Sequence, residues 1–384
     1  MVHRASTKLD VIGLTRELVQ FNTINPPGRE ESCARYLAGL LEAGGLSVEL
    51  TGFGPGRTNL VARTPSTSDR PRLCLTGHLD TVPLGASPWS CDPFGGEIKD
   101  GRVYGRGSCD MKGGVAAMVI AAIEVCRAGP AQAGLLLVLT GGEETGCDGA
   151  AQLARHGVAG PVGAIIVGEP TGNGVLLGHK GALWLEAIAN GTTAHGSMPE
   201  LGVNAIYKVA RTALELERFD FGVPAHPIAG PPTLNVGTIT GGLNINSVPD
   251  RAALTVDIRT IPGQAHSAVR QDLQSRLGPD VELRTLVDLP GVYTEPHGSW
   301  VENVFGIVAD VTRRTQTRRT ATYFTDASVL VPAFSNAPAL IIGPGLPELA
   351  HAIDEYCEIT RIEEAAAIHG RIASNWCLAS SGFL

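Results

Sequence analysis

Two uninterrupted apolar runs, Leu135–Thr140 and Ala164–Val167, constrain the fold of this chain most strongly. Runs of this kind are typical of strands that helices cover on both faces, as in a parallel sheet. Segments with helical apolar spacing alternate with short apolar runs around them, and this β-α-β-α order predicts an α/β domain with a largely parallel sheet. We expect helices at residues 9–21, 30–43 and 112–126, and further strands at residues 47–50, 59–62 and 72–76.

The order of elements changes after about residue 180. The next elements are expected in the order strand, helix, strand, strand, helix, strand, at residues 182–189, 204–216, 233–240, 252–260, 265–277 and 281–286. This order is that of a small ferredoxin-like unit. The first pattern then resumes, with a helix at 300–312, a strand at 339–342 and a helix at 361–377. The sequence therefore predicts a discontinuous domain, residues 1–180 and 292–384, interrupted by an inserted domain at 181–291.

The composition fits a globular chain of two domains. The 384 residues are 43% hydrophobic and 18% charged, which excludes wholesale disorder, and the net charge of −8 leaves no broad basic surface for nucleic acid. The opening segment Met1–Lys8 leads into no secretion signal, and the longest apolar run, Val115–Ile123, is too short to span a membrane. We expect a cytoplasmic protein that binds neither membranes nor nucleic acid, with its cysteines as free thiols.

Glycine makes up 48 of the 384 residues, well above the usual share of roughly 7%. Many of these glycines adjoin histidines and acids directly after expected strands. The segments are Gly77-His78-Leu79-Asp80, Gly141-Gly142-Glu143-Glu144 and Gly168-Glu169. Because ligands collect at the carboxyl ends of strands in α/β sheets, we expect these side chains to lie close together.

Two further segments carry the same residue types. Asp110 lies in a loop with four glycines among residues 105–114, and His351 follows Gly343-Pro344-Gly345. Each residue alone has a plainer interpretation, since Asp110 is also a candidate helix N-cap and adjacent acids are common in solvated loops. Taken together, imidazole and carboxylate groups suit zinc, cobalt or manganese. One acid of the Glu143-Glu144 pair can then ligate while the other acts as a general base.

The order of these five motifs resembles that of the di-zinc metallopeptidase family that includes acetylornithine deacetylase, succinyl-diaminopimelate desuccinylase, aminoacylase and glutamate carboxypeptidase. The resemblance covers nearly the whole chain, from Asn22-Thr23-Ile24-Asn25-Pro26-Pro27-Gly28 to His351. It implies a zinc-exopeptidase-like domain with a mainly parallel sheet flanked by helices. It also implies that the inserted ferredoxin-like domain serves as a lid and in dimerisation.

The resemblance implies a centre of two divalent metal ions. His78 and Glu169 would hold one ion, Glu144 and His351 would hold the other, and Asp110 would bridge both. Zinc is the expected metal, with cobalt or manganese as alternatives.

The resemblance also assigns catalytic roles. Asp80 would orient His78, and Glu143 would take a proton from a metal-bridging water and pass it to the leaving amine. His195, in Ala194-His195-Gly196-Ser197 of the inserted domain, would reach the active site of the other subunit of a homodimer and stabilise the oxyanion.

Two further positions match substrate-binding segments of the family. Asn246 lies in a Gly-rich loop of the inserted domain, and Arg259 ends an expected strand, where its guanidinium can pair with a substrate carboxylate. The turn from Gly343 to Gly345 can offer backbone N–H groups to the same carboxylate. The expected partner is thus a small N-acyl amino acid or short peptide with a free carboxylate.

The implied function is hydrolysis of the amide bond of an N-acyl amino acid, as in acetylornithine deacetylase or succinyl-diaminopimelate desuccinylase. The opening Asn22–Gly28 segment and Phe324-Thr325-Asp326-Ala327-Ser328 favour this branch over a metallo-carboxypeptidase or dipeptidase of the same family. Phe324 stands where the branch usually has glycine, so this chain departs from the family pattern at the expected side-chain pocket.

Two other classes of function are less well supported. A non-catalytic binding module on the same fold predicts a broken ligand set, whereas all five ligand positions and Glu143 are present. A nucleotide-binding enzyme is disfavoured because Gly52-Phe53-Gly54-Pro55-Gly56 lacks the full dinucleotide fingerprint.

Overall fold

The computed structural model describes residues 10–129, 131–157 and 160–378. The opening segment Met1–Lys8, from which we predict the absence of a secretion signal, lies outside these residues. The chain divides into two compact units. The first unit comprises the residues up to Gly178, Thr294–Arg319 and the residues from Thr325 onward, and the second comprises His179–Tyr293 and Thr320–Phe324.

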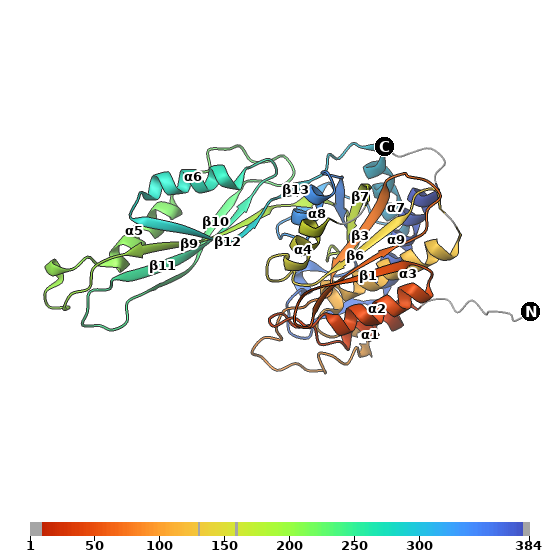
Figure 1. The fold of residues 1–384 in the computed structure, drawn as a ribbon, viewed down its shortest axis with the longest axis horizontal. Helices are drawn as coiled ribbons and strands as arrows, with labels where there is room; N and C mark the ends of the chain where they lie inside the picture. The colour runs from red at the N-terminus through yellow and green to blue at the C-terminus, as the bar shows by residue number, and fades with distance from the viewer. Residues whose placement is uncertain (1–9, 130, 158–159, 379–384) are drawn as a thin grey trace, which may run out of the picture. The chain divides into compact units, whose positions relative to one another are not determined.

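A mixed sheet forms the centre of the first unit (Figure 1). Four neighbouring strands run parallel, in the spatial order β6 (Leu135–Thr140), β3 (Arg72–His78), β7 (Val162–Val167) and β15 (Ala339–Ile341). Antiparallel strands flank them, namely β1 (Ser47–Gly54), β2 (Arg57–Arg63) and β8 (Leu176–His179). The predicted α/β fold with a largely parallel central sheet is thereby confirmed.

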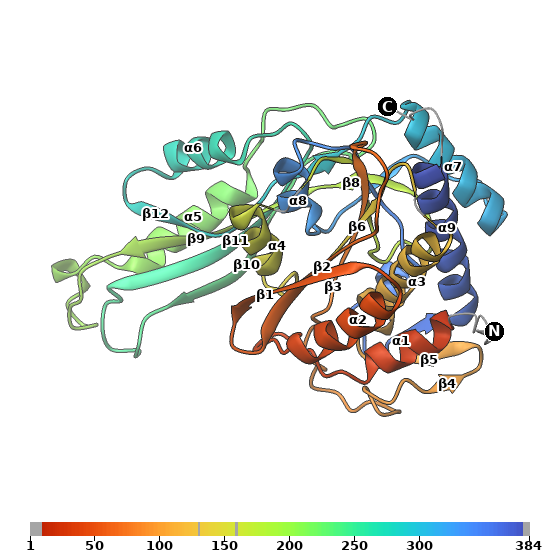
Figure 2. The same ribbon diagram turned by 45° about the vertical axis from the view of Figure 1, so that its right-hand side comes forward.

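Helices cover this sheet on both faces (Figure 2). On one face lie the mutually packed helices α1 (Val11–Val19), α3 (Gly113–Arg127), α7 (Ser299–Thr312) and α9 (Ile359–Leu378). On the other face α4 (Asp148–His156) packs against α8 (Ala327–Ala333). Helix α2 (Glu31–Ala43) packs on β1 and β2 on the same side as α1, where Tyr36 of α2 donates a hydrogen bond to Glu17 of α1. Helix α3 is buried on nearly all sides because Val115–Ile123 contains only apolar residues.

Several short elements could not be predicted from the periodicity of the sequence. A small sheet in the order β16-β5-β4 joins β4 (Ile98–Lys99), β5 (Arg102–Tyr104) and β16 (Tyr356–Glu358). The strands β13 (Val292–Tyr293) and β14 (Arg319–Ala321) lie near the unit boundaries. Strands of two or three residues show no apolar alternation, and α8 contains Pro332, which is a poor helix former.

The second unit is a two-layer α+β structure. Its elements are β9 (Gly181–Asn190), α5 (Ala205–Glu217), β10 (Thr233–Gly241), β11 (Arg251–Thr260), α6 (His266–Leu277) and β12 (Val281–Leu289). The strands form an antiparallel sheet in the order β10-β11-β9-β12, so the predicted ferredoxin-like unit is confirmed. Alternate residues of β9, such as Leu183 and Leu185, pack beneath the helices, whereas Trp184 and Glu186 lie on the opposite face.

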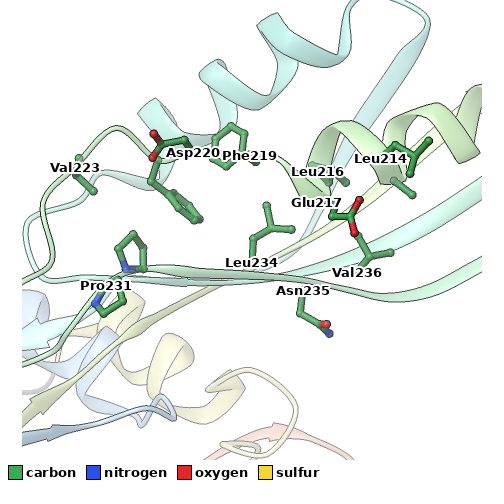
Figure 3. Close-up of a pocket in the computed structure, with 13 residues that line it drawn as sticks. Leu214, Leu216, Glu217, Phe219, Asp220, Val223, Pro231, Leu234, Asn235 and Val236 are labelled. Carbon is green, nitrogen blue, oxygen red and sulfur yellow. The ribbon is translucent and has the colours of Figure 1, made fainter.

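A mostly apolar hollow of ≈ 710 Å³ lies between the end of α5 and β10 in the second unit (Figure 3). Leu214 and Leu216 line it from α5, and Leu234 and Val236 line it from β10.

The described residues also include all the cysteines and the helices that could be long enough to cross a membrane. All eight cysteines lie within the described ranges and are free thiols. In the same ranges, every helix is too short or too polar to cross a membrane.

Candidate metal centre

The predicted ligands follow four neighbouring parallel strands of the first unit. His78 is the last residue of β3, Glu144 follows β6 after Gly141-Gly142-Glu143, and Glu169 lies two residues beyond β7. His351 follows β15 and a short 3-10 turn, Pro347–Leu349, and its φ of +62° is uncommon for a residue other than glycine. Because the strands are parallel, their carboxyl ends bring these side chains to one edge of the sheet.

Asp110 reaches the same edge from a different element. It lies in the turn Ser108–Lys112, immediately before α3. Its φ and ψ are not helical, and the N-cap of α3 is Lys112, which has no side-chain capping hydrogen bond. The N-cap interpretation of Asp110 is therefore wrong, and its carboxylate faces two histidines instead.

The five side chains form two groups that share Asp110. In the first group, His78 Nε2 lies 3.1 Å from Asp110 Oδ1 and 3.7 Å from Glu169 Oε1. In the second, His351 Nε2 lies 3.4 Å from Asp110 Oδ2 and 3.2 Å from Glu144 Oε2. The ligand atoms of each group lie within 4.8 Å of one another. Asp110 thus presents one oxygen to each group.

The centre concentrates buried negative charge. Burial raises the pKa of Glu169 to about 8 and also raises the pKa of Glu144. Burial and then the charge of Glu169 raise the pKa of Glu143 well above its usual range. Hydrogen bonds with Asp110 and Glu144 raise the pKa of His351 to about 10. Divalent cations would lower these raised pKa values, since they favour ionised carboxylates and neutral imidazoles.

The donor set fits such cations. Among the described residues, Glu144 Oε1 is a buried oxygen without a hydrogen-bond partner. Buried polar atoms of this kind normally have a partner, and a metal ion would supply one. Two imidazoles with three carboxylates match the ligands of zinc, and carboxylates also suit manganese.

Asp80 acts on the centre in a way that differs from the expectation. His78 Nδ1 lies 2.9 Å from the backbone carbonyl oxygen of Asp80 and 3.6 Å from its carboxylate, so the backbone fixes the imidazole. The Asp80 carboxylate accepts hydrogen bonds from the backbone N–H groups of Glu143 (3.2 Å) and Glu144 (3.3 Å). Asp80 therefore orients His78 through its main chain and holds the acid pair through its side chain.

Several supporting residues have no role in the sequence-based prediction. Asn25 donates from Nδ2 to Asp80 Oδ2 over 2.9 Å, and buried Asp326 accepts a hydrogen bond from Thr140 at the end of β6. Glu355 is a fully buried carboxylate beside the Asp110 loop. Asn25 and Asp326 lie in segments that carry the family resemblance, whereas Glu355 follows the last of these segments, four residues after His351.

Gly343 and Gly345 pack against the ligand-bearing loops. A Cβ at Gly343 would lie 2.1 Å from the backbone oxygen of Gly168, and one at Gly345 would lie 2.3 Å from that of Cys109. The Gly343 amide already donates to Thr171 Oγ1 over 3.1 Å. The expectation that this amide binds a substrate carboxylate is therefore corrected, because its hydrogen bond is used within the fold.

His195 and Asn246 lie on adjacent loops of the second unit. The Gly196 amide donates to the Asn246 carbonyl oxygen over 2.7 Å, and both predicted side chains belong to exposed residues. The Ser197 amide donates to His195 Nδ1 over 3.2 Å. Since Nδ1 accepts, the proton of a neutral ring resides on Nε2, which then is a donor.

Arg259 lies near the end of β11 on the face opposite the helices. Its Nε lies 2.9 Å from Asp257 Oδ1, and its guanidinium carbon lies 5.9 Å from the centre of the Trp184 ring. The Trp184 ring in turn meets Phe324 edge-on, with 6.0 Å between centroids. Within the described residues, Arg259 Nη1 is buried without a hydrogen-bond partner.

Comparison with known proteins decides the family. Residues 74–375 match the family described as Peptidase family M20/M25/M40. The chain belongs to this family. It is a hydrolase that acts on amide bonds, in agreement with the sequence-based prediction.

Curated relatives of this M20 family chain align along most of its length. It is 31% identical to a probable succinyl-diaminopimelate desuccinylase of Staphylococcus epidermidis, over 90% of this chain and 93% of the relative. It is 32% identical to an acetylornithine deacetylase of Myxococcus xanthus, over 89% of this chain and 91% of that protein.

Solved structures share the fold at lower identity. An M20 family metallo-carboxypeptidase of Sulfolobus solfataricus superposes with a TM-score of 0.77 at 19% identity, covering 95% of this chain and 99% of the other. An aminopeptidase of Bacillus cereus gives 0.73 at 23% identity, covering 94% and 97%.

Proposed function

We propose that this M20 family hydrolase uses two divalent metal ions to remove the acyl group from an N-acyl amino acid. The observation that carries the proposal is the pair of three-residue groups sharing Asp110, with buried Glu143 next to one of their ligands. Support for a deacylase comes from relatives named as a desuccinylase and a deacetylase.

Glu143 is proposed as the general base and acid. It is 6% exposed and belongs to neither ligand group, so its carboxylate is free to accept a proton from water. The hydrogen bond between its amide and Asp80 fixes the backbone from which it acts. A carboxyl group with a raised pKa can then return the proton to the departing amine.

The metal ions are proposed to be zinc, held by His78, Asp110 and Glu169 in one group and by Asp110, Glu144 and His351 in the other. When bound, they would polarise the amide carbonyl and lower the pKa of a water molecule. The chain itself supplies the ligand geometry: Asp80 fixes His78, and Asp110 presents its two oxygens to the two groups.

Residues of the second unit are proposed to bind the rest of the substrate. Among the residues that the structure describes, Arg259 has a buried N–H group without a hydrogen-bond partner, which a substrate carboxylate would satisfy. Asn246 would add a hydrogen bond from the exposed loop beside His195. His195 would donate from Nε2 to the oxyanion that develops on the amide carbonyl.

A homodimer through the second unit completes the proposal. β10 is the edge strand of its sheet, and edge strands with free backbone groups are templates for pairing. The loop after β10 carries Leu243 and Ile245 fully exposed, and Tyr207 of α5 is 64% exposed. Light scattering is expected to give twice the chain mass, and a fully active monomer in dilute solution would contradict this part of the proposal.

A hydrolysis panel tests the proposed reaction. Metal-free protein would be reconstituted with zinc, cobalt or manganese and assayed on acetyl-, succinyl- and glutamyl-amides of amino acids, with metal content measured in parallel. We expect two metal equivalents per chain and cleavage of acyl amides, both lost on chelation. Cleavage of dipeptides alone would favour a dipeptidase or carboxypeptidase, and binding of substrate without any hydrolysis would favour a non-catalytic module.

A further inference from the structure

Glu355 is a fully buried carboxylate near the metal centre that belongs to neither ligand group. Its Oε1 accepts hydrogen bonds from the backbone amides of Cys109 (2.8 Å) and Asp110 (3.0 Å). Its Oε2 accepts from the amide of Gly107 (3.1 Å) and from Arg106 Nη1 (2.6 Å). Three of the four donors are therefore main-chain groups of the loop that presents Asp110, so this one carboxylate determines the path of that backbone.

Arg106 extends these contacts to the other ligand-bearing segments. Its side chain is 1% exposed, and its Nη2 donates to the backbone oxygens of Pro83 (3.1 Å) and His351 (3.5 Å). Pro83 lies five residues after His78 in the same segment, and Glu355 itself lies four residues after His351. The buried pair thus touches the segments of His78, Asp110 and His351.

We propose that Glu355, paired with Arg106, is a positioning residue that holds the Asp110 loop against the His351 segment and so keeps both ligand groups in register. The inference rests on the proposed two-metal function. Glutamine cannot replace Glu355, because its NH₂ group would face amide donors where the carboxylate accepts. Supporting partners of this kind typically change metal affinity or activity by about 10- to 100-fold when they are replaced.

The test is a metal titration of purified full-length Glu355→Gln, with Glu358→Gln as the matched control. Glu358 lies on the same segment, is half-buried and pairs with Arg361 at 2.7 Å. Metal-free proteins would be titrated with Co²⁺ by calorimetry and visible absorption, and their unfolding in urea would be recorded. We expect Glu355→Gln to bind Co²⁺ about 10- to 100-fold more weakly. Its kcat should recover in excess metal at an unchanged KM, and the control should match the wild type.

Each outcome bears on one claim. Wild-type protein that binds no Co²⁺ would contradict the proposed function itself. Wild-type binding together with unchanged binding by folded Glu355→Gln would overturn only the positioning role. If Glu355→Gln does not fold, Glu355→Asp is titrated instead, since it keeps the charge but shortens the reach to the amides. Failure of both variants to fold would also overturn the inference, because Glu355 would then serve the fold as a whole.

Discussion

Most predicted functional residues of the first unit are buried, whereas two of the three in the second unit are exposed. In the first unit, His78, Glu143 and Glu169 are at least nine-tenths buried and follow adjacent strands. In the second unit, His195 and Asn246 are exposed on loops, and the recorded side-chain partner of His195 is Ser197, only two residues away. The buried side chains of the first unit are held in fixed positions, as catalytic groups are. The exposed side chains of the second unit are available to contact a binding partner.

Because of this difference in burial, substitutions in the two regions should change the free energy of unfolding by different amounts. Buried polar side chains need hydrogen-bond partners. In the first unit these partners are distant in the sequence, as are Asp80 and the Glu143 amide. Exposed loop residues need none for stability. Changes in the first unit should therefore alter both folding and reaction, while changes at the exposed residues of the second should alter reaction alone.

The largest effect is expected for Glu143→Gln. The substitution keeps the shape of the side chain but removes the carboxylate that accepts and returns the proton, so kcat should fall about 10²- to 10⁴-fold. Since Glu143 belongs to neither ligand group, metal content should match the wild type. Steady-state kinetics with metal analysis checks both, and a variant that keeps half of the wild-type kcat would remove Glu143 from the mechanism.

The next effect concerns His195. His195→Ala should lower kcat about 10²- to 10³-fold without loss of stability, because the residue is exposed. If His195 acts across a homodimer, His195→Ala co-expressed with Glu143→Gln should regain activity, up to about a quarter of the wild-type value for random pairing. Co-purified mixed dimers without any recovered activity would place His195 in its own subunit's reaction or outside the reaction.

Each unit contains a buried histidine that should make its stability depend on pH. Burial lowers the pKa of His369, in α9, to about 4 from 6.5, and its ring nitrogens have no hydrogen-bond partner among the described residues. Between these pH values the unfolded chain binds a proton that the folded chain does not, so stability falls as pH drops, by up to about 3 kcal/mol. His369→Leu should flatten this fall in urea unfolding between pH 4 and 7.

His179, in the second unit, offers the matching test. Its pKa is likewise lowered to about 4 by burial, so His179→Leu should flatten the acid loss of whichever unfolding transition belongs to the second unit. Identical pH profiles for the wild type and both variants would contradict the assignment of acid sensitivity to these two rings.

The sequence predicted the strongly patterned parts of both units and missed what depends on distant contacts. Apolar runs such as Leu135–Thr140 identify strands because burial on both faces demands them. The role of Glu355 could not be derived, since its partners at residues 106–110 lie far away in sequence. For Asp80, the motif indicated contact with His78, but whether the carbonyl or the carboxylate makes it depends on the backbone path.

The smallest expected effects come from two glycines. Gly343→Ala would place a Cβ within 2.4 Å of the backbone oxygens of Gly168 and Glu169, so it should destabilise the first unit by about 1–3 kcal/mol and weaken metal binding. Gly237→Ala, in β10, meets its nearest atom at 3.4 Å and should change stability by less than about 0.5 kcal/mol. Urea unfolding with metal analysis compares them, and equal effects would contradict tight packing at the centre.

The position of β15 in the sheet has a consequence for synthesis. This strand lies between β7 and β8 in the sheet, although β7 ends at Val167 and β8 at His179, and β15 begins only at Ala339. The inserted unit is complete in sequence before the first unit has its last central strand or His351. A nascent chain can therefore fold its insertion first, and the two ligand groups can come together only after His351 has been synthesised.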